Sequence, residues 1–314
     1  MRRHRTEMND MIDIHADDYG LSVNTSKEML EFLQDGVFDS ISIITNNTCY
    51  EQCMDMLKKK IPALPFLPKM SVHLNLVEGY YLSDPGRMIN ASWKDLFLAS
   101  FLPGRKKRVS KLLEKEISAQ LKKGWDGIKA CIDIAKKSGV KCEQEKIRVD
   151  SHQHTHMIPV VWESLQRSLQ NCGFEAEYIR NSREPLSPFI SEVSLWQSYR
   201  LVNIIKNRIL RFMSRPAERY DRKNGHEPMY LWGLVMSGNM DADRIGILYR
   251  RMTDTAKAKN RRLEILFHPG RMTKDECSPE IPKDAAESFY LSDGRDIEKE
   301  GARFTLSQNL SAIK

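Results

Sequence analysis

The stretch VDSHQHTHM, residues 149–157, decides how the rest of this chain is interpreted. Its three histidines, His152, His154 and His156, follow a short apolar run and an aspartate. Side chains two residues apart on a strand point to the same face, so an extended backbone here would aim all three imidazoles into one cavity. Imidazole is the commonest metal ligand and titrates near neutral pH. The stretch predicts a metal or acid–base site, with a polar strand edge or loop as the alternative.

Strand-like and helix-like patterns alternate about seven times along the chain, without a change of composition between them. This alternation predicts an α/β fold with a parallel sheet. We expect a single-domain (β/α) barrel, a distorted seven-stranded TIM-like barrel, in preference to an open sheet. Strands are expected at residues 11–16, 40–45, 70–76, 177–180, 230–236 and 263–267, and another, the fourth along the chain, at the apolar run that leads into the histidine stretch.

The longest amphipathic pattern covers residues 109–137 and predicts one or two helices, interrupted near Gly124. Residues 84–104 contain scattered aromatic side chains and are expected to form a long loop. Residues after 270 are less patterned, and we expect a cap or tail with one short helix there.

The composition allows a sizeable core and predicts a solvated surface with a mild cationic excess. The 314 residues include 49 basic and 42 acidic ones, a formal charge of +7, with no nucleic-acid-binding motif. The six cysteines show no paired spacing, as expected of thiols in a reducing compartment. The basic start of the chain precedes polar residues instead of the apolar core of a signal peptide, and no run of 18 apolar residues exists. The sequence therefore predicts a cytoplasmic protein without nucleic-acid or membrane partners.

Polar side chains collect where the expected strands end. Asp17 and Asp18 follow the first strand, His73 lies in the third, His152 follows the fourth and His268 follows the last. Active sites of such barrels lie at the carboxyl ends of the strands, so these five residues predict one site. Taken singly, four of them have a structural explanation: a turn or helix cap for Asp17 and Asp18, a buried hydrogen-bonded histidine for His73, and a turn histidine for His268.

Four motifs carry a resemblance to a known family. They are ADDYG at 16–20, SVHL at 71–74, DSHQHTH at 150–156 and FHPG at 267–270, in that order. Together they resemble the YdjC-like carbohydrate deacetylases, which include the chitooligosaccharide deacetylases and are related to the NodB-type polysaccharide deacetylases. The resemblance spans about residues 11–270. It implies a (β/α) barrel with about seven strands.

The resemblance also implies roles for the site residues. The metal ligands would be Asp18, His73 and His152, with Asp17 as general base and His268 as general acid. The remaining polar residues of the motif, which could orient a ligand or contact the substrate, are Asp150, His154 and His156.

The chemistry implied is metal-dependent hydrolysis of an N-acetyl group on an amino sugar or short chitooligosaccharide, with or without a phosphate. A metal polarises the acyl carbonyl and lowers the pKa of its water, and an acid must protonate the leaving amine. The resemblance suggests one Mg²⁺ or Zn²⁺ ion, and the two imidazoles favour Zn²⁺, Mn²⁺ or Co²⁺ over Mg²⁺.

The chain is longer than compact family members. The barrel domain is expected over residues 1–270, with insertions near 84–108 and 185–228, and residues 271–314 as a C-terminal cap or tail of the same domain. The basic run at 104–108 could meet a phosphorylated sugar or simply begin a solvated helix. Trp93, Trp196 and Trp232 could stack on sugar rings or belong to the core.

Two other functions fit parts of the pattern. A glycan- or phosphosugar-binding barrel with a non-catalytic metal would need neither Asp17 nor His268. Two histidines and a carboxylate also form the ligand set of non-haem Fe(II) oxygenases, but those enzymes are usually built on antiparallel barrels. A homo-oligomer is compatible with the sequence, which does not specify one.

Overall fold

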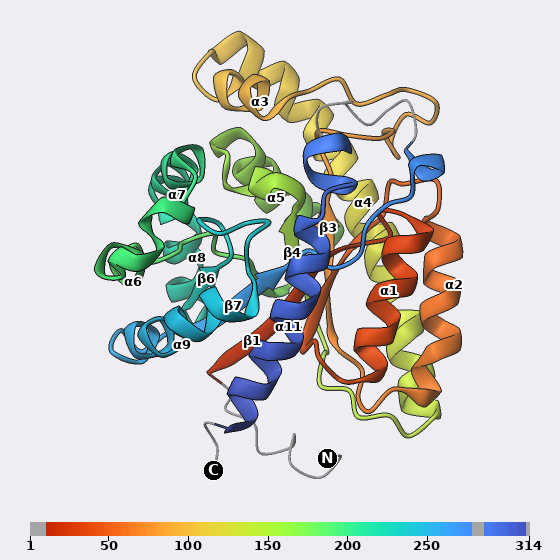
Figure 1. Cartoon of the computed structure of the whole chain (residues 1–314). Coiled ribbons are helices and arrows are strands. Elements are labelled where there is room, and N and C mark those ends of the chain that lie inside the picture. The colour runs from red at the N-terminus through yellow and green to blue at the C-terminus, as the bar shows by residue number, and fades with distance from the viewer. Residues whose placement is uncertain (1–10, 278–285, 312–314) are drawn as a thin grey trace.

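The computed structural model describes residues 11–277 and 286–311, so the basic start of the chain lies outside the described residues, as does part of the predicted C-terminal cap. Seven strands and a surrounding set of helices form one α/β unit (Figure 1). The strands are β1 (Ile12–Tyr19), β2 (Ser40–Ile44), β3 (Lys69–Leu74), β4 (Ile147–Ser151), β5 (Ala176–Ile179), β6 (Met229–Trp232) and β7 (Arg262–Phe267).

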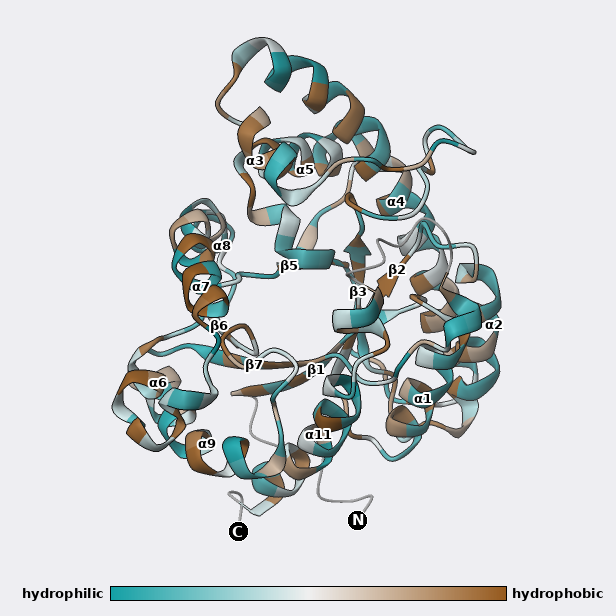
Figure 2. Ribbon diagram, turned by 45° about the horizontal axis from the view of Figure 1, so that its top comes forward, coloured by the Kyte–Doolittle hydropathy of each residue, from teal (hydrophilic) through white to brown (hydrophobic). Residues whose placement is uncertain are grey.

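All seven strands run parallel in the order β5-β4-β3-β2-β1-β7-β6. The sheet curls into a barrel with helices outside it (Figure 2). Its edges meet through the chain that leaves β5, because the Leu231 N–H donates a hydrogen bond of 3.0 Å to the Arg183 carbonyl. Across the interior, Arg180 Nε donates to Glu264 Oε1 at 2.6 Å. The predicted distorted TIM-like barrel is confirmed.

The two faces of the sheet differ in chemistry. Alternate residues such as Ile14, Val72 and Val149 are fully buried in the apolar core. The residues between them point into the barrel and are polar and buried: Asp13, His15, Asp17, Ser40, Ser42, Ser71, His73, Arg148, Asp150 and Glu264. TIM barrels usually fill this space with branched apolar side chains. Here a hydrogen-bonded polar network replaces them. The polar side chains of the barrel interior are therefore continuous with those at the carboxyl ends of the strands.

The connections supply the outer layer. The helices are α1 (Val23–Gln34), α2 (Tyr50–Lys60), η2 (Ile61–Ala63), α3 (Trp93–Ala99), α4 (Pro103–Lys137), η3 (His152–Met157), α5 (Pro159–Cys172), α6 (Ser187–Ser191), η4 (Val193–Ser198), α7 (Leu201–Met213), α8 (Arg215–Asn224), α9 (Ala242–Lys257), η5 (Lys274–Glu276), η6 (Ala286–Tyr290) and α11 (Gly294–Ser311). None of them is long and apolar enough to cross a membrane in the part of the chain that the structure describes.

The predicted interruption near Gly124 is wrong, because α4 runs unbroken over 35 residues. A Cβ at Gly124 would lie 2.8 Å from Val72 Cγ2 and 3.0 Å from Thr45 Cγ2. The glycine therefore lets the helix approach the sheet closely.

We expect Gly124→Ala to lower the free energy of unfolding by about 1–3 kcal/mol, since an added methyl group overpacks a buried contact. Gly104→Ala in the same helix is the control, because a Cβ there meets nothing within 4 Å. That change should be neutral or stabilise by up to about 1 kcal/mol. Urea unfolding of both variants measures the difference, and equal midpoints would contradict this role of Gly124.

The regions expected to be insertions contain helices. Residues 84–104, predicted as a loop, include α3, which begins at a capping box formed by Ser92 and Asp95. Residues 185–228 form α6, η4, α7 and α8. Beyond residue 270, the short helix we expected is instead α11, with 18 residues.

Strand β6 ends at Trp232, earlier than the predicted residue 236. The chain turns at Gly233, where φ is 150°, and the N–H groups of residues 233–235 donate to the buried Glu184 carboxylate at 2.8–3.1 Å. These groups therefore bind a side chain in place of a neighbouring strand.

Candidate metal centre

An irregular end of β1 presents two adjacent carboxylates to the same end of the barrel. The register between β1 and β2 shifts between Ala16 and Tyr19, and Asp18 has a left-handed backbone with φ 72°. In a regular strand Asp17 and Asp18 would point to opposite faces. Here both lie near one imidazole, since His73 Nδ1 is 3.9 Å from Asp17 Oδ1 and His73 Nε2 is 3.6 Å from Asp18 Oδ1.

Asp17 is held by the guanidinium of Arg180, the residue that directly follows β5. Arg180 donates two hydrogen bonds of 2.8 Å to its carboxylate, and His15 Nε2 lies 3.0 Å from Asp17 Oδ1. Burial alone raises the pKa of Asp17, but Arg180, together with His73 and His15, holds that pKa well below its usual range. Asp17 is therefore a fixed, ionised carboxylate.

Asp18 is paired with a residue from the far end of the chain. The Arg295 guanidinium, from α11, binds Asp18 Oδ2 and also donates to the Gly270 carbonyl at 3.2 Å. Burial raises the pKa of Asp18, but Arg295 and His152 outweigh it and lower that pKa. With Oδ2 paired, Oδ1 is the oxygen that faces the two histidines.

His73 offers one nitrogen to this oxygen. Its Nδ1 donates to Asp150 Oδ1 at 2.7 Å, as expected for a residue that orients a ligand histidine. Its Nε2 is buried and has no hydrogen-bond partner among the described residues. Burial lowers the pKa of His73, but Asp17, Asp150 and Asp18 raise it more. An unpartnered buried nitrogen that faces a carboxylate is what a cation ligand requires.

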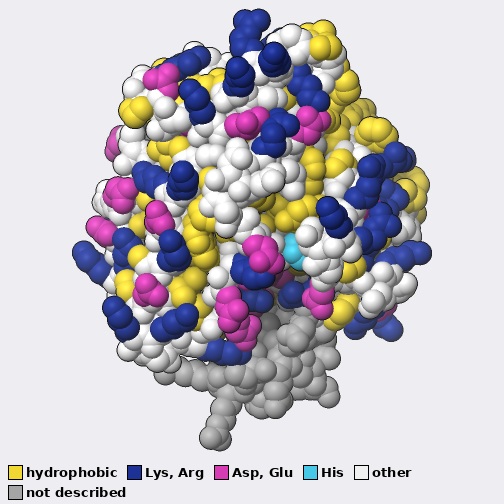
Figure 3. Space-filling view, turned by 180° about the vertical axis from the view of Figure 1, so that it is seen from behind, with side chains coloured by type: hydrophobic (Ala, Val, Ile, Leu, Met, Phe, Trp, Pro, Cys, Tyr) yellow, Lys and Arg dark blue, Asp and Glu magenta, His cyan; other side chains and the backbone are white. Residues whose placement is uncertain are grey.

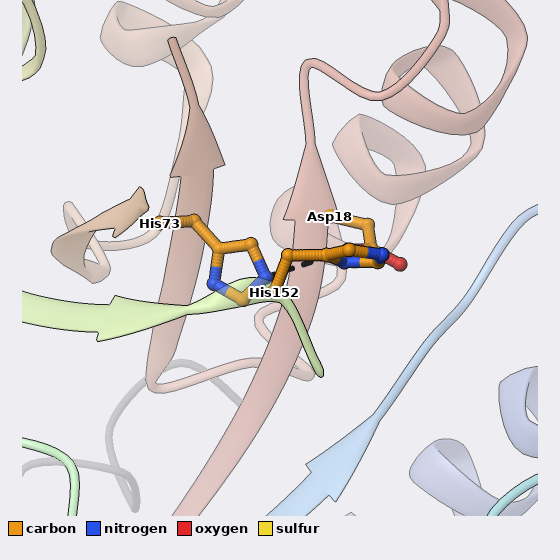
Figure 4. A group of neighbouring side chains, drawn as sticks. All are labelled: Asp18, His73 and His152. Carbon is orange, nitrogen blue, oxygen red and sulfur yellow. Dashed lines mark hydrogen bonds and ion pairs between the residues drawn. The ribbon is translucent and has the colours of Figure 1, made fainter. Parts of the chain in front are cut away.

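His152 completes the group. Its Nδ1 lies 3.2 Å from Asp18 Oδ1, and its Nε2 donates to the Tyr290 hydroxyl oxygen at 2.8 Å. That hydroxyl in turn donates to Glu78 Oε2 at 2.6 Å. Asp18, His73 and His152 each have a ligand atom within 4.8 Å of the others and converge from three strand ends (Figure 4). Two imidazoles and one carboxylate could hold a divalent ion with coordination positions left over.

The prediction that the histidine stretch is a strand is wrong beyond Ser151. Residues 152–157 form a tight turn in which Gln153 and His154 have φ of 53° and 55°. Left-handed backbone is costly for such residues and is commonest at functional sites. The turn sends the three imidazoles in different directions, so they do not share one cavity.

Of the three histidines in this stretch, only His152 lies beside Asp18 and His73. His154 Nδ1 contacts the Ser182 hydroxyl at 3.0 Å, and His156 Nε2 donates to the Arg180 carbonyl at 2.9 Å. Burial lowers the pKa of His156 to about 4 and holds that of His154 well below its usual value. Both are neutral at neutral pH, and His156 fixes the backbone that carries Arg180.

His268, which directly follows β7, lies near Asp17 at the same end of the barrel. Its Nδ1 and its backbone N–H both donate to Glu298 Oε2, at 3.1 and 2.6 Å. Its Nε2 is 4.0 Å from Asp17 Oδ2, and 13% of its side chain is exposed. The imidazole is thus oriented by a carboxylate on one side and can reach solvent.

A second group, His15, Asp17 and Asp150, has a similar spacing. The positive charge between its carboxylates is supplied by an arginine side chain. Arg180 lies 2.8 Å from Asp17 and 3.2 Å from Asp150, and it also pairs with Glu264. Of these two groups of described residues, Asp18, His73 and His152 are therefore the better candidate to hold a metal ion.

The family model described as YdjC-like protein matches residues 11–130 and 145–310 of this chain. The chain belongs to the YdjC-like family. The predicted resemblance is thereby confirmed, and the match continues past residue 270 to include α11. No curated protein matches the chain. A crystal structure of an Enterococcus faecalis protein, provisionally described as a cellobiose-phosphate cleavage protein, is 15% identical with a TM-score of 0.46, covering 92% of this chain and 94% of that one.

The sequence motifs of the YdjC-like family did not indicate several residues that the fold adds to the site. They are His15, Glu78, Arg180, Tyr290, Arg295 and Glu298. Tyr290 and Arg295 come from the region expected to be an unpatterned tail. The available signal was that Arg295 and Glu298 lie on the same face of one helix as small and apolar residues, where charged side chains are unusual. A search for apolar helix faces does not detect such positions.

The three tryptophans considered for sugar stacking have different surroundings. Trp232 is fully buried, and Trp93 stacks on Phe97 with ring centroids 5.4 Å apart. Trp196 is 53% exposed, on η4.

We expect Tyr290→Phe to weaken metal binding about 10- to 100-fold, because His152 Nε2 loses its partner. Titration calorimetry with Zn²⁺ measures this directly, without an activity assay. Tyr249→Phe is the matched control, since the buried Tyr249 hydroxyl has no hydrogen-bond partner among the described residues. Equal Zn²⁺ affinities of the two variants would show that Tyr290 does not orient His152.

Proposed function

We propose that this chain is a metal-dependent hydrolase that removes the N-acetyl group from an amino sugar or a short chitooligosaccharide, with or without a phosphate. The observation that carries the proposal is the placement of Asp17 and His268 beside the group Asp18, His73 and His152, at one end of the barrel. Membership of the YdjC-like family supports a carbohydrate substrate. A protein that only binds a glycan has no need of the two additional groups.

The proposed metal ligands are Asp18 Oδ1, His73 Nε2 and His152 Nδ1. The unpartnered His73 nitrogen supports this choice, as do Asp150 and Tyr290, which occupy the other ring nitrogens. When bound, a divalent ion supplies Lewis acidity at an acyl carbonyl and lowers the pKa of a coordinated water. Two imidazoles favour Zn²⁺, Mn²⁺ or Co²⁺ over Mg²⁺.

Asp17 is the proposed proton acceptor. Arg180 keeps it ionised and fixes both oxygens, so it orients the attacking water and takes its proton as the tetrahedral carbon forms.

His268 is the proposed proton donor. Its Nε2 lies 4.0 Å from Asp17 Oδ2, so it can give a proton to the leaving nitrogen close to where Asp17 receives one. Protonation of this nitrogen is required, because an amide anion is a very poor leaving group. The Glu298 carboxylate accepts a hydrogen bond from Nδ1 and so holds the ring with Nε2 free to face the leaving nitrogen.

Acetate release tests the proposal. Purified protein is incubated with N-acetylglucosamine, its oligomers and their 6-phosphates, after chelation and after addition of Zn²⁺, Mn²⁺, Co²⁺ or Mg²⁺. Metal-dependent acetate release that is lost in His152→Ala supports the deacetylase. Tight binding of one metal and of a sugar without acetate release would favour the glycan-binding alternative.

A further inference from the structure

The outer face of α7 is apolar and exposed. At 100° per residue its exposed large hydrophobic side chains fall within one 100° sector, and the buried Met213, Leu210 and Asn207 follow in that order from one edge of this sector. Their exposed fractions are 71% for Leu201, 65% for Val202, 51% for Ile205, 40% for Ile209 and 65% for Phe212. Ile190, Val193 and Trp196, which precede α7 in the chain, are 58%, 65% and 53% exposed. We call the five exposed hydrophobic residues of α7 the α7 patch.

Basic side chains border the α7 patch. Arg208 and Arg211 lie beside the apolar sector, on the side away from Met213. No acidic residue occurs between Glu192 and Glu218. Within the described residues, neither of these two cations has an ion-pair partner, and Glu192 itself is paired with Arg251 at 3.1 Å. The border of the patch therefore carries uncompensated positive charge.

A second surface of the same kind lies at the junction of α3 and α4. Leu98, Phe101 and Leu102 are 42%, 64% and 51% exposed, and the basic run 104–108 follows them. Arg105 and Lys106 pair with Asp95 and Glu163, whereas Lys107 and Arg108 have no ion-pair partner in the described part of the chain. The expected solvated helix start is confirmed, since α4 begins at Pro103 and residues 104–108 are exposed or half-buried, and apolar side chains adjoin it.

Both surfaces flank the mouth of the barrel. The junction of α3 and α4 follows β3, and α6 to α8 follow β5. Each of these segments therefore leaves the sheet at the carboxyl ends of the strands, where Asp18, His73 and His152 lie. Figure 1 shows α3 and α7 at that end, and Ser214, which directly follows α7, contacts the histidine turn, since its hydroxyl lies 3.4 Å from Met157 Sδ. Figure 3 shows Lys and Arg side chains beside hydrophobic ones at the top of the molecule, where α3 lies.

We propose that these two surfaces dock the protein on an anionic lipid membrane, with the mouth of the barrel toward the headgroups. An apolar helix face bordered by Lys and Arg binds at the membrane interface, where the apolar side chains enter the acyl boundary and the cations meet anionic headgroups. The sequence argument against a membrane partner rested on the lack of a spanning segment, which does not bear on surface docking.

A second copy of the chain fits the α7 patch less well. A twofold contact would place the same patch on both sides and bring two basic borders together without acidic partners. The missing countercharge is what an anionic membrane provides.

Co-sedimentation of the full chain with vesicles tests this inference independently of the proposed reaction. Vesicles contain phosphatidylcholine alone or with 30 mol% phosphatidylglycerol. We expect binding only to the anionic vesicles, and weaker binding at high salt. Arg208→Gln with Arg211→Gln should weaken it about 30-fold, since each cation near an anionic surface contributes about fivefold. Ile205→Ser with Phe212→Ser should weaken it more than about tenfold.

The control variants lie on α9, outside both surfaces. Arg250→Gln with Lys257→Gln, and Ile247→Ser, change exposed residues of the same types and should alter binding less than about twofold. Circular dichroism confirms that each variant is folded. Absence of binding to anionic vesicles, equal binding to both kinds of vesicle, or an equal loss in the α9 controls overturns the inference. So does a dimer in light scattering that Phe212→Ser dissociates, if the vesicles are not bound.

Discussion

Arg180→Met is expected to lower the free energy of unfolding by about 3–5 kcal/mol, the usual cost of removing one partner from a buried ionic network. Arg180 is fully buried and is the cation shared by Asp17, Asp150 and Glu264. Without it, three carboxylates would remain in the barrel with no guanidinium between them. Methionine fills a similar volume, so a cavity contributes little to the expected loss.

Urea unfolding monitored by circular dichroism measures the effect. Arg271→Met is the control, because Arg271 is 40% exposed and pairs with Asp293 and Asp296 at the surface. Exposed ion pairs contribute up to about 1 kcal/mol, so this control should unfold almost as the parent does. If Arg180→Met lost no more stability than the control, the barrel network would not depend on its central cation.

Asp17→Asn and Asp18→Asn are expected to abolish the proposed activity in two different ways. The first removes the proton acceptor but leaves Asp18, His73 and His152 in place, so kcat should fall about 10²- to 10⁴-fold while metal affinity stays near that of the parent. The second removes a ligand, so metal affinity itself should fall more than about 100-fold, beyond the loss usual for an orienting residue.

Zn²⁺ calorimetry and acetate release on both variants separate the two roles. The pair is well matched, because the residues are adjacent, buried and changed in the same way. An Asp17→Asn variant that bound metal and kept full activity would remove Asp17 from the mechanism. An Asp18→Asn variant with unchanged metal affinity would refute the ligand assignment.

The sequence by itself determined the barrel and the places where its chemistry collects. Parallel α/β alternation can be recognised locally, since each strand and helix leaves its own periodicity in the chain. For the same reason, Asp17, Asp18, His73, His152 and His268 could be assigned to one end of the sheet: residues that follow parallel strands lie at the same edge. The family motifs lie in these same local segments, and the YdjC-like match agrees with them.

The partners of those residues were decided only by the tertiary structure. Arg295 pairs with Asp18 across 277 positions, and Tyr290 binds His152 across 138, so no local pattern could connect them. The histidine stretch shows the limit most clearly, because its alternation fits a strand, whereas Ser151 hydrogen-bonds the His156 backbone and closes a turn. The polar barrel interior has the same origin: Arg180 can be buried only where Asp17, Asp150 and Glu264 from three other strands surround it.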